Sequence, residues 1–201
     1  AQTYDNLWKQ ADAYRQKDLP KSEIGVMRKI SAKASASKDY GQLLAAEMRQ
    51  AMLWKSISTD SLTPAIQRLR LQEQHTADPM LKAVWNAVLG KLYKENVYYI
   101  DASDEEVANK RYRVNRAKAQ AYFMKALAQP ELLTRHASTE YAPLTMRGLD
   151  GASFGNDMLH LIGFEADTKE AYLEMYTYYN KVGNRGAACL CAFEVIRKYR
   201  Q

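Results

Sequence analysis

The chain contains few of the residues that interrupt helices or cross-link small folds. Its 201 residues include only 5 prolines and 9 glycines, which is too few for the many turns of an all-β sandwich. No apolar run approaches the roughly 18 residues that a membrane-spanning helix needs. Cys189 and Cys191 are two residues apart, so they cannot cross-link distant parts of the fold. These absences favour long helices and no membrane span.

The composition is that of a globular protein with a moderately basic surface. Hydrophobic residues make up 47% of the chain and charged residues 26%, far from the balance of a disordered chain. The 29 basic residues exceed the 23 acidic ones, for a net charge of +6. Such a charge permits nucleic acid or an anionic surface as a partner but does not require either.

Apolar residues recur at helical spacing along nearly the whole chain, whereas the alternation typical of strands is almost absent. The clearest helix start is "ADPMLKAVWNAVLGKLYKENVYYI", where Asp78 can cap the helix and Pro79 occupies the first position. One apolar face then follows over more than three turns, at Leu81, Val84, Trp85, Val88, Leu89, Leu92 and Tyr93. We predict an all-α fold of about eight or nine helices in a single domain over residues 1–201.

Part of this pattern resembles a tetratricopeptide unit. The stretch "LGKLY" resembles the first helix of such a unit, and the second helix is matched at Ala119, Phe123, Ala126 and Pro130. Trp85 lies one residue too far upstream, and the insertion between the two halves is long. We therefore expect an irregular stack of antiparallel helix pairs rather than a regular array.

Small residues inside predicted helices indicate places where two helices approach closely. "AYRQKDLPKSEIGVMRKI" and "YYNKVGNRGAACLCAFEVI" both pass from tyrosine through a short polar turn into a helix with small residues. A glycine inside a helix costs about 1 kcal/mol relative to alanine. We therefore expect Gly25 to have a packing role.

The region from about residue 129 to 157 departs from helical periodicity. It reads "QPELLTRHASTEYAPLTMRGLDGASFGND" and contains two prolines and three glycines. An irregular segment of this length is unusual between packed helices and is often functional. We hypothesise that Tyr141, Leu144 and Met146 anchor it against a groove between helix pairs. Its tip would then be free to bind a neighbouring protein domain.

No residue set has the spacing of a catalytic, cofactor or metal site. The cysteines have no zinc-ligand set around them, and we expect both to be buried and unpaired. The chain has no G-x-S-x-G, G-x-G-x-x-G or P-loop pattern. His160, inside an apolar helix, is the one candidate for an alternative in which the protein is a hydrolase-type enzyme using residues 129–157. A core or boundary histidine is the commoner role.

A second alternative is a helical repeat that binds nucleic acid. The run "KRYRVNRAK" holds five cations, at Lys110, Arg111, Arg113, Arg116 and Lys118. The acidic stretch "DASDEE" ends shortly before it, and this order is typical of a solvated helix whose charges suit its dipole. We therefore predict no nucleic-acid partner.

Two long stretches lie near the two ends of the chain: "YDNLWKQADAYRQKDLPKSEIGVMRKISAKASASKDYGQLLAAEMR" and the region from "FGNDMLHLIGFEA" to "YYNKVGNRGAACLCAFEVIRKYR". They resemble the N-terminal helical segment of the large α2-macroglobulin-like exported proteins of Bacteroidetes. In that family the thioester and β-sandwich domains lie outside this segment, and no C-x-E-Q thioester motif follows Cys189 here.

The resemblance implies a non-enzymatic interaction or scaffolding domain, the N-terminal module of a larger envelope protein. Its partners would be neighbouring domains of the parent chain or an envelope protein. The start "AQTYDNLWKQ" is typical of a chain that follows a cleaved signal peptide. We therefore expect a periplasmic, cell-envelope or extracellular location.

Overall fold

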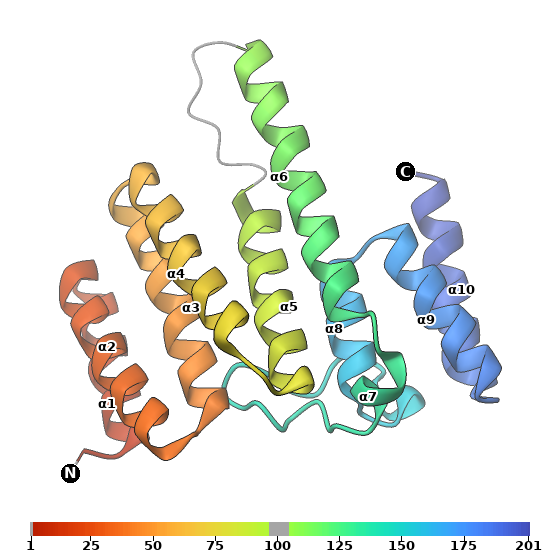
Figure 1. Cartoon of the computed structure of the whole chain (residues 1–201), viewed down its shortest axis with the longest axis horizontal. Helices are drawn as coiled ribbons and strands as arrows, with labels where there is room; N and C mark the ends of the chain where they lie inside the picture. Colours follow the sequence, from red (N-terminus) through yellow and green to blue (C-terminus); the bar gives the residue numbers. More distant parts are fainter. Residues whose placement is uncertain (1, 97–104) are drawn as a thin grey trace. The chain divides into compact units, whose positions relative to one another are not determined.

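The computed structural model describes residues 2–96 and 105–201 (Figure 1). These residues form helices joined by short connections, apart from the irregular segment 135–150. They form ten α-helices and two 3₁₀ helices, and contain no β-strand, only an isolated bridge between Ala137 and Asp157. The all-α prediction is confirmed. Nine of the ten α-helices have at least nine residues, and the tenth has five. The quoted helix 79–100 is described only to Asn96, and its last four residues lie outside the described part.

The described residues fall into two compact units. Unit 1 comprises residues 2–75 together with Tyr141–Met146. Unit 2 comprises the described residues of 76–140 and Arg147–Gln201. The single domain over residues 1–201 stays a prediction. The segment expected to be irregular, 129–157, contributes to both units and contains a helix of five residues and one 3₁₀ turn.

Unit 1 is built of successive helices that run in opposite directions and pack on their neighbours in sequence. They are α1 (Tyr4–Gln16), α2 (Pro20–Ser37), α3 (Tyr40–Ile57), the 3₁₀ helix η1 (Thr59–Ser61) and α4 (Leu62–His75). Pro20 begins α2 and Asp39 caps α3, as side-chain chemistry favours. The apolar stripes of α1 and α2 meet in a core that includes Leu7, Met27 and Ile30. Helices α1 and α2 therefore bury their apolar stripes against each other.

Unit 2 contains two antiparallel pairs and a short central helix. Its elements are α5 (Pro79–Asn96), α6 (Glu105–Ala126), α7 (Pro130–Thr134), η2 (Gly151–Phe154), α8 (Met158–Ala166), α9 (Lys169–Lys181) and α10 (Arg185–Tyr199). Helix α5 pairs with α6 and α9 pairs with α10, while α8 contacts α5, α6, α7 and α9. The predicted cap of α5 is present, because the amide of Leu81 donates to Asp78 Oδ1 at 2.7 Å.

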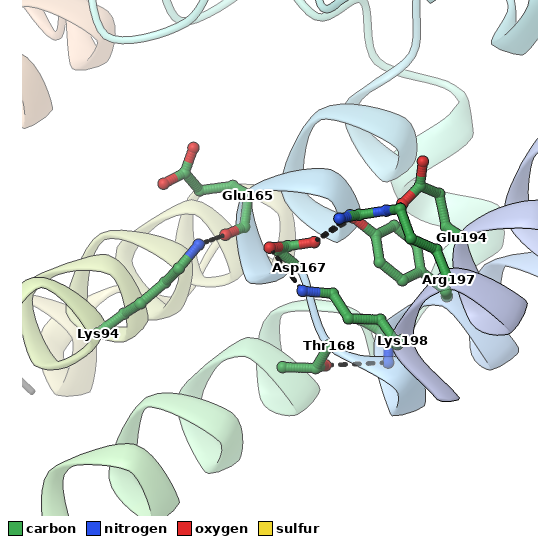
Figure 2. A network of polar contacts seen from close by, with 9 residues as sticks. Lys94, Glu165, Asp167, Thr168, Glu194, Arg197 and Lys198 are labelled. Atoms are coloured by element: carbon green, nitrogen blue, oxygen red, sulfur yellow. Dashed lines mark hydrogen bonds and ion pairs between the residues drawn. The ribbon is translucent and has the colours of Figure 1, made fainter. Parts of the chain in front are cut away.

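A polar network fixes the chain where α8 ends and α9 begins. Asp167 ends α8 in the left-handed region, with φ of 52°. Figure 2 shows its carboxylate between Arg197 and Lys198 of α10, which donate to it at 3.3 and 2.8 Å. The hydroxyl of Tyr172 donates to the same carboxylate at 2.7 Å. Burial acts to raise the pKa of Asp167, but hydrogen bonds from Lys198 and Tyr172 outweigh it, and the net pKa is lowered.

Two helical glycines allow a neighbouring segment to pack closely against their helix, and a third does not. A Cβ on Gly90 of α5 would lie 2.8 Å from the Phe123 ring of α6, so this glycine allows the two helices to approach. A Cβ on Gly41 would collide with backbone atoms of the Tyr141–Met146 segment, including the Tyr141 carbonyl carbon at 2.7 Å. The packing role expected for Gly25 is wrong, because nothing lies within 4 Å of its Cβ position.

This contrast predicts opposite effects for two substitutions in unit 1. Gly41→Ala should destabilise the protein by about 1–3 kcal/mol, because the new methyl group meets backbone that cannot rotate away. Gly25→Ala should stabilise it by about 1 kcal/mol, because alanine favours the helix and meets no neighbour. Urea denaturation followed by circular dichroism measures both. Shifts of the same sign would contradict the packing described for Gly41.

Candidate functional site

The three residues predicted to bind a protein differ in their exposure within unit 1. Tyr141 is buried, and its carbonyl group packs against Gly41 at the start of α3. Leu144 is half-buried, whereas Met146 is 69% exposed. The structure therefore places Tyr141 as an anchor of this segment and leaves Met146 at the surface. The role of the three residues in binding a protein stays a prediction.

Asp157 holds the start of α8 against α9 in a buried polar contact. Its carboxylate accepts the backbone amide of His160 at 2.8 Å and the hydroxyl of Tyr179 at 2.9 and 3.0 Å. Burial raises the pKa of Asp157, although these hydrogen bonds oppose the shift. Burial also raises the pKa of Tyr179, and the neighbouring carboxylate adds to this effect. Both groups therefore serve to join two helices.

His160 is enclosed by aromatic rings beside this contact. Its side chain is 1% exposed and stacks on Phe154, with ring centroids 3.9 Å apart and planes within 7°. Phe164 packs its edge against the imidazole at 4.6 Å, and Gly148 lies against the Cε1 edge. Neither ring nitrogen has a hydrogen-bond partner in the described part of the chain. Burial lowers the pKa of His160 to about 4. A general base must reach the proton that it removes, and the described residues enclose the His160 side chain.

Because the folded state disfavours the imidazolium, stability should fall in acid. The folded pKa of about 4 lies below the ordinary value of 6.5, so the unfolded chain binds a proton first as the pH falls. The free energy of unfolding should therefore decrease between pH 6.5 and about 4. The decrease is at most about 1.4 kcal/mol per pH unit, or about 3 kcal/mol in total. Urea denaturation at a series of pH values measures it.

The variant His160→Phe keeps the aromatic packing and should remove most of this pH dependence. The matched control is His75→Gln, at an exposed histidine, which should leave it unchanged. The raised pKa of Asp157 acts in the opposite direction near its own titration and is present in all three proteins. An unchanged acid dependence in His160→Phe would assign the loss of stability to other groups.

The two cysteines face different surroundings. Cys191 is buried, as expected, but Cys189 is exposed, so the prediction for Cys189 is wrong. Residues two apart on a helix point in different directions, and only one of them can face the α9 partner helix. Burial raises the pKa of Cys191 to about 12. In the described residues there is no group of three or more His, Cys, Asp and Glu side chains that could hold a metal ion.

Thiol labelling should therefore show two phases in the native protein. Cys189 should react at the rate of an accessible thiol, while Cys191 should react only when the fold opens, because it is buried and holds its proton. Cys189→Ser should remove the fast phase, and Cys191→Ser should remove the slow one. Two fast thiols in the wild-type protein would contradict the burial of Cys191.

The basic run lies on exposed positions of α6. The side chains of Lys110, Arg111, Arg113, Arg116 and Lys118 are all exposed. The helix begins with Glu105 and Glu106, so both signs of charge occur along it. Lys118 also lies over the Tyr93 ring of α5, 5.4 Å from its centroid. No described helix is long and apolar enough to cross a membrane.

The pair α9 and α10 presents an apolar surface that sequence analysis did not identify. On α10, Phe193, Ile196 and Tyr199 are 64%, 55% and 68% exposed. The amine of Lys169 lies 4.5 Å from the centroid of the Tyr199 ring, which puts the start of α9 beside the end of α10. The exposed residues Leu173 and Tyr176 follow Lys169 by four and seven positions and so share its side of α9. We call these five apolar side chains the α9–α10 face; they are Leu173, Tyr176, Phe193, Ile196 and Tyr199.

Comparison with known proteins adds no assignment: no family model, no curated protein and no solved structure matches the chain.

Proposed function

We propose that this chain is a non-enzymatic helical interaction domain that binds another protein through the α9–α10 face. The observation that carries the proposal is the exposure of three large apolar side chains on one helix, Phe193, Ile196 and Tyr199. Single exposed apolar residues are normal, but a contiguous group of them marks an interaction surface. Phenylalanine and tyrosine are also among the residues enriched in protein interfaces.

Two cations beside this face form hydrogen bonds with acidic groups of the same unit, which favours an apolar partner surface. Arg197 donates to Glu194 at 2.6 Å and to Asp167 at 3.3 Å. Lys198 donates to Asp167 at 2.8 Å (Figure 2). A partner that covers Phe193 and Ile196 therefore would not desolvate either cation without a carboxylate beside it.

The proposed partner is a neighbouring domain of a larger exported α2-macroglobulin-like protein, or another envelope protein. The resemblance of the first and last quarters of the chain to the helical segment of that family supports this choice. In this proposal the domain is the N-terminal module and acts outside the cytoplasm. Within unit 1, Met146 is proposed as a further contact, with Tyr141 and Leu144 positioning its segment.

Charge substitutions on the α9–α10 face test the proposal. The double variant Phe193→Asp with Ile196→Asp should keep its helical content, because both positions are exposed. It should bind the polypeptide encoded directly downstream of Gln201 at least about 100-fold more weakly, as expected for the loss of two apolar anchors. Calorimetry with the separately produced downstream segment measures this affinity.

Two further variants act as comparisons. Val114→Asp places the same charge on an exposed apolar position of α6 and should leave the affinity unchanged. Met146→Asp tests the contact proposed in unit 1 separately. Wild-type affinity in the double variant would overturn the α9–α10 face as the binding surface. A downstream segment without β-sandwich domains would overturn the proposed parent protein.

A further inference from the structure

Unit 1 contains a groove of about 310 Å³ between α2, α3 and α4. Helix α3 forms its floor with residues three or four positions apart, and α2 and α4 supply side chains on either side. We call this the α2–α4 groove; its lining includes Arg28, Gln50, Ala51, Trp54, Ala65 and Arg68. Its volume lies at the lower end of the range for small-ligand pockets, about 300–1,000 Å³. The groove therefore fits a ligand about the size of one amino-acid residue.

The floor carries a buried acceptor that the fold leaves unused. Gln50 is 4% exposed, and its Oε1 has no hydrogen-bond partner in the described residues. A buried polar group without a partner costs about 1–3 kcal/mol of stability. This oxygen is itself buried, so a donor in the groove reaches it only when the Gln50 amide turns toward the groove. An incoming N–H group would satisfy it.

A cation is held at the side of the same groove. The guanidinium of Arg28 lies over the ring of Trp54, 5.9 Å from its centroid, and makes no hydrogen bond to the described residues. A cation–π contact leaves the N–H groups of a guanidinium available for a carboxylate. The second cation, Arg68, donates to the buried carboxylate of Glu47 at 2.9 Å. This ion pair compensates the negative charge of Glu47 and leaves the charge of Arg28 unbalanced.

We infer that the α2–α4 groove binds an N-acyl α-amino carboxylate, either a free N-acyl amino acid or the C-terminal residue of a polypeptide. Arg28 binds the carboxylate, and Gln50 accepts the adjacent amide N–H. Ala51, Trp54 and Ala65 contact an apolar side chain. This site lies in unit 1 and does not depend on the α9–α10 face, so the two proposals can fail separately.

Four probes test the ligand class: N-acetyl-leucine, its carboxamide, an acetylated hexapeptide that ends in leucine, and the carboxamide of that peptide. Titrations followed by NMR of ¹⁵N-labelled protein report both the affinity and the residues that shift. At least one acid should bind, with the largest shifts in α2–α4 and in the Trp54 indole. Each acid that binds should do so at least about tenfold more tightly than its amide, because the amide loses the charge-assisted bond to Arg28.

The comparison of the two acids identifies the source of the ligand. Equal affinities mean that the terminal residue is sufficient, as for a free N-acyl amino acid. Tighter binding of the peptide means that the ligand is a polypeptide end. Equal binding of acids and amides, shifts outside α2–α4, or no binding at millimolar concentration would each overturn the proposal.

Substitutions in the groove assign the roles. Arg28→Gln should lower the affinity for the acid about tenfold and leave the amide unaffected. Lys29→Gln removes the same charge from the adjacent exposed position and should change neither affinity. Gln50→Leu should weaken binding and also stabilise the fold, since it removes the unpaired amide oxygen. A fully retained affinity in Gln50→Leu would show that Gln50 does not contact the ligand and would overturn its assignment.

Discussion

The structure depends on one constraint: each helix has an apolar side that must be covered by an antiparallel neighbour. Helix α1, at the end of unit 1, packs mainly against α2 and fully buries only Leu7 and Ala11. A helix with neighbours on two sides buries more of its surface than its apolar residues occupy. Helix α3, which contacts both α2 and α4, is the clearest case, and its polar residues Glu47 and Gln50 are buried.

The buried polar groups of unit 1 differ in whether they have a partner within the fold. Glu23 of α2 is buried but paired with Arg49 and Arg15, and Glu47 is paired with Arg68. Each carboxylate thus has a charged partner that offsets the cost of its burial. Gln50 is the exception in this set, because its oxygen has no partner in the described residues. The free energy lost by burying this unpaired oxygen would be regained if a bound ligand donated a hydrogen bond to it.

Unit 2 shows a different use of polar contacts. Asp157 and Asp167 flank the short helix α8, and each joins it to a later helix, Asp157 through Tyr179 and Asp167 through Arg197 and Lys198. Lys94 adds a bond from α5 to the carbonyl of Glu165 at 2.5 Å (Figure 2). The contacts of Arg197 and Lys198 with Asp167 thus pair two cations of α10 with a carboxylate of the same unit. The outer side of that helix is left to Phe193, Ile196 and Tyr199, and this exposure is what makes a protein-binding role the best-supported proposal.

The sequence by itself determined the helical class and several helix starts. Pro20, Asp39, Asp78 and Pro79 mark the beginnings of α2, α3 and α5 because capping and backbone geometry act within a few residues. The tertiary structure alone decided which helices cover one another and which apolar side chains stay exposed. In that structure Cys191 is buried and Cys189 exposed, and the space beside Gly25 is open. Tyr141 packs against Gly41, about 100 positions away in the chain. The α9–α10 face and the α2–α4 groove belong to this second class. Helical periodicity arises from bonds between residues four apart, whereas coverage of a face depends on contacts between distant segments, which no local pattern specifies.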